Sequence, residues 1–415
     1  MSFQTRLAAL ALAALTASAL AADPAPHWVG TWRASPQPLW DGGFVLPVNA
    51  PFQFVDETVR QPMRVSLGGA RWRVAIANTY GREPLHIGAA SFARSAGDAA
   101  VVPGSSRTLT FGGATSVRVP PGAEVLSDPV ALALPSLAKV AVSLHLPGPA
   151  APSTFHWDAR DTGWVAPGNA VAAPALTDAR PLPVRVFVAR LLVAGDAANG
   201  TVVTLGDSIT DGNGATPGAD RRWPDALAER LAPQGLAVEN AGISGARLLS
   251  DGMGRSALAR VDADVFASPR VRTVVVALGT NDIGWPGGPF SPHEAPMTAE
   301  RLIAGHRLLV ERLRTQGLRV VGTTVPPFEG ALAGTPLEGH HSPAKEAVRQ
   351  AVNAWLRSGG VYDAMVDVDA LLRDPARPAR LAPRFDSGDH LHPNDAGYRA
   401  MAEAVAPAVS PASGR

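Results

Sequence analysis

The chain has 415 residues, of which 46% are hydrophobic and 18% are charged. The length predicts more than one domain, and the composition excludes disorder over the whole chain. The 37 basic and 36 acidic residues leave a net charge of +1, so binding of nucleic acid through a bulk basic field is excluded. Cysteine is absent, which excludes disulfides, thiolate zinc sites and a cysteine nucleophile.

Residues 1–22 have the pattern of a secretory signal peptide. Arg6 precedes a Leu/Ala run that ends at Leu20, and residues 19–21 form a small-x-small cleavage site. The run is shorter than the ~20 apolar residues that a membrane-spanning helix needs. We therefore expect cleavage near residues 21–22, a periplasmic or secreted protein, and no membrane insertion.

Residues 25–196 are typical of a β-rich accessory domain. Short runs of alternating apolar residues are separated by Gly and Pro turns, without a long amphipathic helix. The clearest predicted strands are 72–76, 116–119, 139–146 and 184–188. This pattern favours a β-sandwich or jelly-roll-like fold. We expect a long loop over 166–183 and a hinge at 197–200.

Residues 200–410 follow a different pattern, in which apolar strands alternate with helices. The predicted strands are 201–205, 237–240, 273–278, 319–325 and 364–368. The predicted helices are 222–232, 299–315, 343–356 and 394–405. This alternation indicates a three-layer αβα domain with a parallel sheet. Five strands fit the flavodoxin-like order 2-1-3-4-5, in which sites form at the carboxyl ends of the strands.

Ser208 follows the first of these strands directly, in the hexamer Leu-Gly-Asp-Ser-Ile-Thr at 205–210. Gly206 permits a sharp turn there. A serine at a strand's carboxyl end is placed as a nucleophile must be, provided that a base can take its proton. The alternative is that Asp207 or Ser208 only caps a turn or a helix.

Two more polar segments follow the next strands, at 240–245 and 279–282. A glycine N–H and the amide of Asn281 are suitable donors for a developing oxyanion. Taken singly, Gly245 also fits a turn, and the Asn281–Asp282 pair also fits a loop or helix cap.

The segment 388–393 lies just before the last predicted helix. Asp389 and His392 are three residues apart, a spacing that lets the carboxylate reach and orient the imidazole. The alternative is a metal site formed by Asp389, His390 and His392. We expect His340 and His341 to be solvated loop residues.

Together these segments resemble the four sequence blocks of the SGNH, or GDSL, hydrolase family. The blocks occur in the family order across about residues 200–410. They are Gly206-Asp207-Ser208-Ile209, Gly242 with its neighbours, Gly279-Thr280-Asn281-Asp282 and Asp389-His390-Leu391-His392.

The resemblance implies a role for each matching residue. Ser208 would be the nucleophile, His392 the general base and then acid, and Asp389 the group that orients His392. The N–H groups of Ser208 and Gly242 and the side-chain amide of Asn281 would form the oxyanion hole. No cofactor or metal is implied.

Four shorter segments, at 222–225, 251–254, 281–284 and 386–389, resemble the extracellular XynE-like subgroup of this family. Its members are associated with esterase action on plant polysaccharides. The preceding β region, with Gly30-Thr31-Trp32 and the segment 122–129, resembles two-domain members of that subgroup.

Tryptophans are the candidate sugar-stacking residues. Six lie before residue 165 and are interpreted mainly as core of the β region: Trp28, Trp32, Trp40, Trp72, Trp157 and Trp164. Trp223 and Trp285 lie near the first and third blocks, so we expect them to be better substrate-binding candidates.

The expected function is hydrolysis of short-chain esters, acetyl foremost, on a carbohydrate or related polyol, so the expected substrate is a small-molecule or polysaccharide ester. A broad-specificity lipase or arylesterase is the first alternative. A glycan-binding protein with a vestigial hydrolase domain is the second. Nothing in the sequence specifies an oligomeric state.

Overall fold

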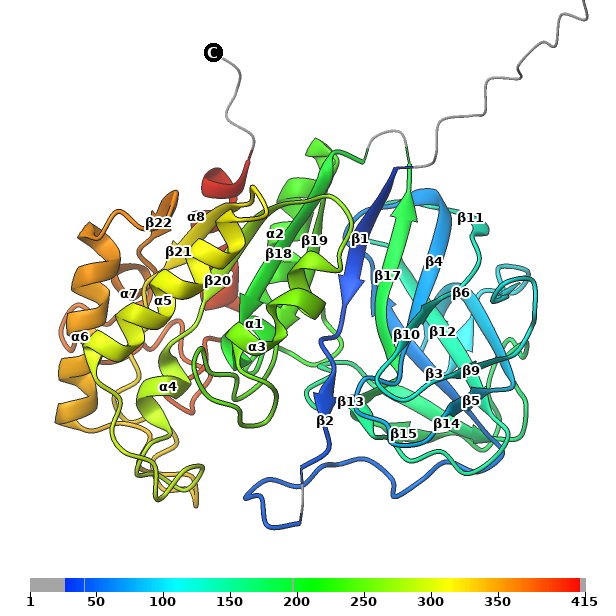
Figure 1. Cartoon of the computed structure of the whole chain (residues 1–415), viewed down its shortest axis with the longest axis horizontal. Coiled ribbons are helices and arrows are strands. Elements are labelled where there is room, and N and C mark those ends of the chain that lie inside the picture. The colour runs from blue at the N-terminus through cyan, green and yellow to red at the C-terminus, as the bar shows by residue number, and fades with distance from the viewer. Residues whose placement is uncertain (1–26, 41, 196–197, 411–415) are drawn as a thin grey trace, which may run out of the picture.

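The computed structural model describes residues 27–40, 42–195 and 198–410. The predicted signal peptide lies outside these residues. Figure 1 shows a β region on the right and an α/β region on the left, with strands β1 (Trp28–Arg33) and β2 (Gln37–Pro38) between them. Among the helices of the described residues, none has both the length and the apolar character that a bilayer span requires.

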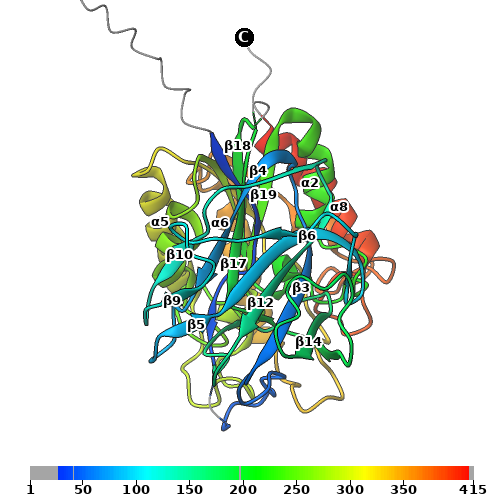
Figure 2. The same ribbon diagram turned by 90° about the vertical axis from the view of Figure 1, so that its right-hand side faces the viewer.

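The β region consists of antiparallel sheets. One has the order β1-β17-β4-β10, with β11 also paired to β4; the second has the order β15-β14-β3-β12-β6-β7, with β8 also paired to β6 (Figure 2). The first sheet contains β17 (Val188–Ala194), β4 (Gly69–Ala77), β10 (Glu124–Leu126) and β11 (Val130–Leu134). The second contains β15 (Arg180–Leu182), β14 (Gly163–Pro167), β3 (Glu57–Arg64), β12 (Lys139–Leu146), β6 (Ala89–Gly97), β7 (Ala100–Val101) and β8 (Arg107–Thr108). Smaller sheets pair β16 (Arg185–Val186) and β2 with β13 (Thr154–His156), and β5 (Leu85–Ile87) with β9 (Val117–Val119).

The two larger sheets share one hydrophobic core. Trp72 of β4 and Phe92 of β6 are both fully buried, and their ring centroids lie 5.4 Å apart. The same cluster includes Val74 of the first sheet and Val142 of the second. The sheets therefore pack face to face, as in a sandwich; the jelly-roll arrangement stays a prediction.

Two local expectations in the β region were wrong. The segment 166–183 is not a continuous loop. Its first residues belong to β14, its last residues belong to β15, and these two strands pair antiparallel. The predicted strand 184–188 is broken at Phe187, whose φ of 62° no regular strand can contain. The chain leaves β16 there and enters β17.

The α/β region contains one parallel sheet in the order β19-β18-β20-β21-β22. Since β18 comes first in the chain, this is the predicted order 2-1-3-4-5. Its strands are β18 (Gly200–Gly206), β19 (Leu236–Gly242), β20 (Val271–Ala277), β21 (Arg319–Thr323) and β22 (Ala364–Val366). The helices are α1 (Ser208–Asp211), α2 (Trp223–Leu231), α3 (Ala257–Val261), α4 (Thr280–Gly284), α5 (Ala299–Arg314), α6 (Pro343–Ser358), α7 (Val368–Leu372) and α8 (Asp395–Val409). A 3-10 turn (Ala232–Gln234) and a π-helical turn (Asp262–Phe266) complete them.

Helices cover both faces of this sheet. Val203 and Val274 belong to a cluster with apolar residues of α5 and α6, whereas Val202 and Val275 belong to a cluster with residues of α2 and α8. Successive strand residues point to opposite faces. Each strand therefore needs a continuous apolar run to fill the cores on both faces, which explains why apolar and polar residues do not alternate along these strands.

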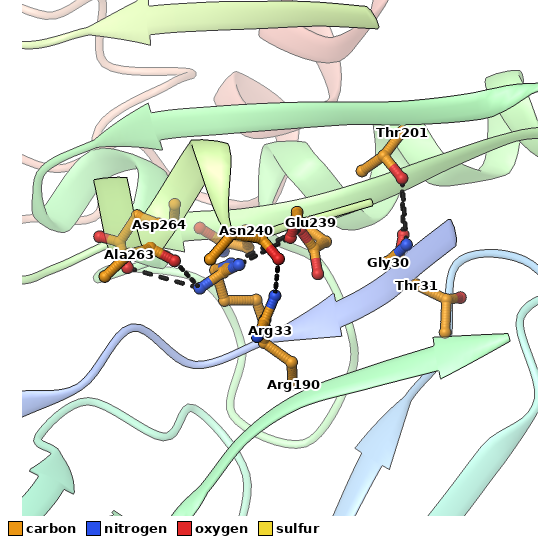
Figure 3. Close-up of polar contacts among 12 residues, drawn as sticks. Gly30, Thr31, Arg33, Arg190, Thr201, Glu239, Asn240, Ala263 and Asp264 are labelled. Carbon is orange, nitrogen blue, oxygen red and sulfur yellow. Dashed lines mark hydrogen bonds and ion pairs between the residues drawn. The ribbon is translucent and has the colours of Figure 1, made fainter. Parts of the chain in front are cut away.

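The two regions meet where β1 lies beside β19. The Gly30 N–H donates to Thr201 Oγ1 at 3.1 Å. The guanidinium of Arg33 reaches from β1 to Glu239 of β19 and to Asp264, at 3.5 Å from each carboxylate (Figure 3). All three charged side chains are buried. A Cβ on Gly30 would overlap the Glu239 carboxylate, so only glycine permits this close approach.

Gly30→Ala should destabilise the protein by about 1–3 kcal/mol, because the methyl group must displace a carboxylate that is held in a buried network. Gly148→Ala is the matched control, since a Cβ there meets nothing within 4 Å. Urea unfolding of both variants measures the difference. Equal stability of the two variants would contradict the close approach.

Candidate active site

Ser208 stands at the carboxyl end of the central strand β18, as the first residue of α1. The Asp207 side chain caps this helix by accepting the Ile209 N–H at 3.0 Å. A Cβ on Gly206 would overlap the side chain of Thr210, so glycine allows the chain to turn directly from strand to helix. Both sequence interpretations hold here: Asp207 is a cap, and Ser208 lines a pocket.

A chain of hydrogen bonds joins Ser208, His392 and Asp389. His392 Nε2 lies 2.8 Å from Ser208 Oγ, and His392 Nδ1 lies 2.6 Å from Asp389 Oδ2. Asp389 Oδ1 also accepts the N–H groups of Leu391 and His392. Burial would raise the pKa of Asp389, but these hydrogen bonds and the nearby imidazole outweigh it and hold that pKa well below the usual range. An ionised Asp389 requires the proton on Nδ1, which leaves Nε2 free to accept the Ser208 proton.

His390 points elsewhere. Its Nδ1 lies 2.5 Å from Asp386 Oδ2, and 42% of its side chain is exposed. His390 and His392 thus have separate carboxylate partners. Across the described residues, no group of three or more His, Asp or Glu side chains could hold a metal ion.

Asn281 lies at the start of α4, at the carboxyl end of β20. One hydrogen of its side-chain amide is donated to the Ala246 carbonyl at 3.1 Å. The amide has a second N–H. Asn281 lines the same pocket as Ser208, so the structure brings these two predicted residues together.

The predicted role of Gly242 needs correction. Its N–H is donated to Asn240 Oδ1 at 2.9 Å, and the residue does not line the pocket. Gly245 does line it, and within the described residues its N–H has no hydrogen-bond acceptor. Gly245 has a φ of +72°, and a Cβ there would lie 2.6 Å from Met253 Sδ. Gly245 therefore replaces Gly242 as the candidate backbone donor.

The pocket around Ser208 has a volume of about 170 Å³. Besides the residues above, its lining is mostly apolar: Leu46, Trp157, Met253, Trp285, Phe290, Leu332, Leu337 and Leu391. Trp285 stacks on Phe290 with ring centroids 4.6 Å apart and planes inclined by 13°. The structure thus places Trp285 at the site, as predicted from its position near the third block.

Trp223 is not at this site. It is fully buried in the core under α2, and its Nε1 lies 3.4 Å from Thr210 Oγ1. Nearness in sequence to the first block was misleading, because Trp223 packs in the apolar core with residues of α2 and α8 and does not line the pocket. A substrate cannot reach this side chain, so its predicted binding role is withdrawn.

Sequence reasoning missed two pocket residues from the β region, Leu46 and Trp157. Trp157 donates its Nε1–H to the carbonyl of Pro47 at 2.9 Å. Because Pro47 directly follows Leu46, this hydrogen bond holds the Leu46 segment beside Trp157. Trp40 packs against Trp157 and Phe44, and Phe44 in turn contacts Trp285. No local pattern in the sequence distinguishes these tryptophans from those of the β core.

His340 was expected to be solvated, but it is buried and lines the pocket. Its ring packs edge-on against Phe328 with centroids 5.6 Å apart. A Cβ on Gly284 would overlap the imidazole. Burial, aided by the nearby Lys345 ammonium, lowers the pKa of His340 to about 3, so the ring is neutral.

Two buried carboxyl groups support the strand ends. Asp282 accepts the N–H groups of Leu248 and Leu249 at 2.8 and 3.1 Å, which fixes the chain just after Gly245. Burial raises the pKa of Asp282 to about 6 and that of Asp207 to about 7.

Residues 204–400 match the GDSL-like Lipase/Acylhydrolase family. Similar solved structures include a GDSL-like lipase from Bacteroides thetaiotaomicron VPI-5482, 20% identical, which covers 51% of this chain and 87% of its own with a TM-score of 0.37. The acetyl xylan esterase AlAXEase is 20% identical and covers 51% of this chain and 100% of its own, with a TM-score of 0.37. A candidate arylesterase from Agrobacterium tumefaciens str. C58 is 21% identical and covers 51% and 98%, with a TM-score of 0.38. No curated protein matches the chain.

The raised pKa of Asp207 predicts a pH-dependent stability. The folded protein holds this proton up to a pH of about 7, whereas the unfolded chain releases it near pH 4. The protonated Asp207 side chain therefore contributes fully to the free energy of unfolding below pH 4, and this contribution is lost as the pH rises toward 7. Asp207→Asn should gain stability relative to wild type as the pH rises from 5 to 7, by roughly 2 kcal/mol over that interval.

Urea unfolding at pH 5, 6, 7 and 8 measures this difference. Asp367→Asn is the control: burial would raise the pKa of Asp367, but Arg357 and the Ala370 N–H outweigh it and hold that pKa at about 2. The change in the free energy of unfolding caused by Asp367→Asn should be the same from pH 5 to pH 8. A pH-independent effect of Asp207→Asn would show that Asp207 is already ionised at pH 5.

Proposed function

Because residues 204–400 form a domain of the GDSL-like lipase/acylhydrolase family, we propose that the protein is a serine esterase acting on short-chain esters, acetyl esters foremost. The observation that carries the proposal is the hydrogen-bonded chain from Asp389 through His392 to Ser208, which ends in a pocket that also holds Asn281 and Gly245. A nucleophile, its base and two oxyanion donors are what acyl transfer requires.

In the proposed reaction, Ser208 Oγ attacks the ester carbonyl while its proton passes to His392 Nε2. The carbonyl oxygen becomes an oxyanion, which the Asn281 amide and the N–H groups of Ser208 and Gly245 stabilise. His392 then returns the proton to the leaving alcohol, and an ester of Ser208 remains. Water attacks this ester with His392 as base, the acid leaves, and Ser208 regains its proton.

Pocket size supports a short acyl group. Small-molecule sites for drug-sized ligands usually have volumes of roughly 300–1,000 Å³, whereas this pocket has about 170 Å³. A small pocket of this volume suits an acetyl group better than a bulky acyl group.

The alcohol is proposed to be a carbohydrate, on the strength of the resemblance to the XynE-like subgroup and of the predicted export. The apolar lining, with Trp157, Trp285 and Phe290, also suits an aromatic ring. An arylesterase is therefore the second candidate. Acetylated polysaccharides and aryl acetates, compared by released acetate per enzyme, separate the two.

Ser208→Ala should abolish hydrolysis of p-nitrophenyl acetate, with a loss of several orders of magnitude in kcat and an unchanged melting temperature. His392→Ala should be nearly as inactive, because Nε2 is the base. His390→Ala should keep most of the activity, since its imidazole faces Asp386.

A folded Ser208→Ala protein that keeps even a tenth of the wild-type rate would overturn the assignment. If His390→Ala is inactive while His392→Ala is not, the base is misassigned. Binding of acetylated glycans without any turnover by wild type would favour a vestigial site.

Trp157→Ala should widen the range of accepted esters, because it removes a wall of a small pocket. We expect kcat/KM for p-nitrophenyl butyrate, relative to acetate, to rise roughly 10-fold, since a pocket discriminates about that much per methylene. The matched control is Trp164→Ala, from β14, which does not line the pocket. If Trp157→Ala discriminates among acyl groups and among alcohols as the wild type does, Trp157 is not a pocket wall in solution.

A further inference from the structure

His156 reaches from the β region into the α/β region. It lies in β13, one residue before Trp157, and its side chain is 6% exposed. Its Nε2 lies 2.9 Å from Asp211 Oδ1, and its Nδ1 lies 3.0 Å from the Ser35 carbonyl oxygen. The ring is therefore held at both nitrogens.

Asp211 links this imidazole to the site. It is the last residue of α1, the short helix that begins at Ser208. Its second oxygen, Oδ2, accepts both the N–H and the hydroxyl of Ser244, each at 2.9 Å. Ser244 directly precedes Gly245, the candidate backbone donor. One carboxylate thus joins the helix of the proposed nucleophile to the turn of the proposed oxyanion hole.

The hydrogen bonds define the charge of His156. A carbonyl and a carboxylate are both acceptors, so the ring satisfies both only with a proton on each nitrogen. Burial would lower the pKa of His156, but the Asp211 carboxylate, with Asp158 nearby, outweighs burial and raises it. His156 and Asp211 therefore form a buried ion pair.

We propose that His156 is a positioning residue for the reaction: it holds the Asp211 carboxylate so that the 243–245 turn, and with it the Gly245 N–H, keeps its place beside Ser208. This inference rests on the proposed function. It makes the β region a working part of the active site, because that region supplies the imidazole. An oxyanion exists only after attack, so a misplaced donor should lower kcat and leave KM nearly unchanged.

Two substitutions at position 156 separate the two hydrogen bonds of the ring. In His156→Gln the amide nitrogen takes the place of Nε2 and can still donate to Asp211. In His156→Asn the amide nitrogen takes the place of Nδ1 and reaches only the Ser35 carbonyl. We expect His156→Asn to lose about 10–100-fold in kcat, as small displacements of reacting groups do, and His156→Gln to stay within about threefold of wild type.

Hydrolysis of p-nitrophenyl acetate by the full chain, with melting temperatures measured in parallel, gives kcat and KM for each variant. His145→Asn is the matched control, because His145 of β12 forms a similar pair with Asp56 at 2.9 Å within the β region. It should keep wild-type kcat.

Three results would overturn the proposal: a folded His156→Asn protein with wild-type kcat, equal losses of kcat in the Asn and Gln variants, or a change in KM alone. If His156→Asn does not fold, His156→Met, which fills the space without donating, takes its place under the same criteria. Ser208→Ala distinguishes the two levels of inference: if it remains active, the proposed function fails, whatever His156 does.

Discussion

A buried network of charges fixes the two regions of the chain to each other. Arg33 enters from β1, and Glu239 and Asp264 belong to the α/β region. Arg260 also pairs with Asp264 and donates to the carbonyls of Gly206 and Ala241, at the carboxyl ends of β18 and β19. Removing one partner from a buried ion pair costs about 3–5 kcal/mol, because the other charge stays buried without compensation. The regions are therefore expected to remain docked.

This fixed docking gives the pocket its shape. Leu46 and Trp157 can line a cavity beside Ser208 only if the β region does not move relative to the parallel sheet. The same condition applies to His156, which contacts Asp211 across the seam. The β region was expected to be an accessory domain; its contacts instead suggest that it shares in forming the site.

Much of the α/β region could be predicted from the sequence, because its information is local. Each strand carries its own apolar run, and each functional block follows a strand end, so parallel order alone brings Ser208 and Asn281 together. The three-residue offset of Asp389 and His392 likewise lies within one turn. Gly242 was chosen wrongly over Gly245 because which N–H is free depends on the side chain of Asn240, a tertiary detail.

The contributions of the β region could not be predicted, because they depend on contacts between residues far apart in the sequence. Trp157 lies 51 positions before Ser208, and nothing in its neighbourhood distinguishes it from the core tryptophans. His340 was misjudged for the same reason: its burial comes from packing against Phe328 and Gly284. The break at Phe187 reflects a backbone conformation that no periodicity reveals.

The central claim is that Ser208 is the nucleophile of a His392-assisted acyl transfer. Reaction with diethyl p-nitrophenyl phosphate tests it most directly, since an activated serine displaces p-nitrophenolate and keeps the diethylphosphoryl group. Intact-mass and peptide mass spectrometry should show one such group, on the peptide that contains Ser208, appearing in step with the loss of esterase activity and much more slowly in His392→Ala. Inactivation without modification of Ser208, or with the group on another residue, would contradict the claim.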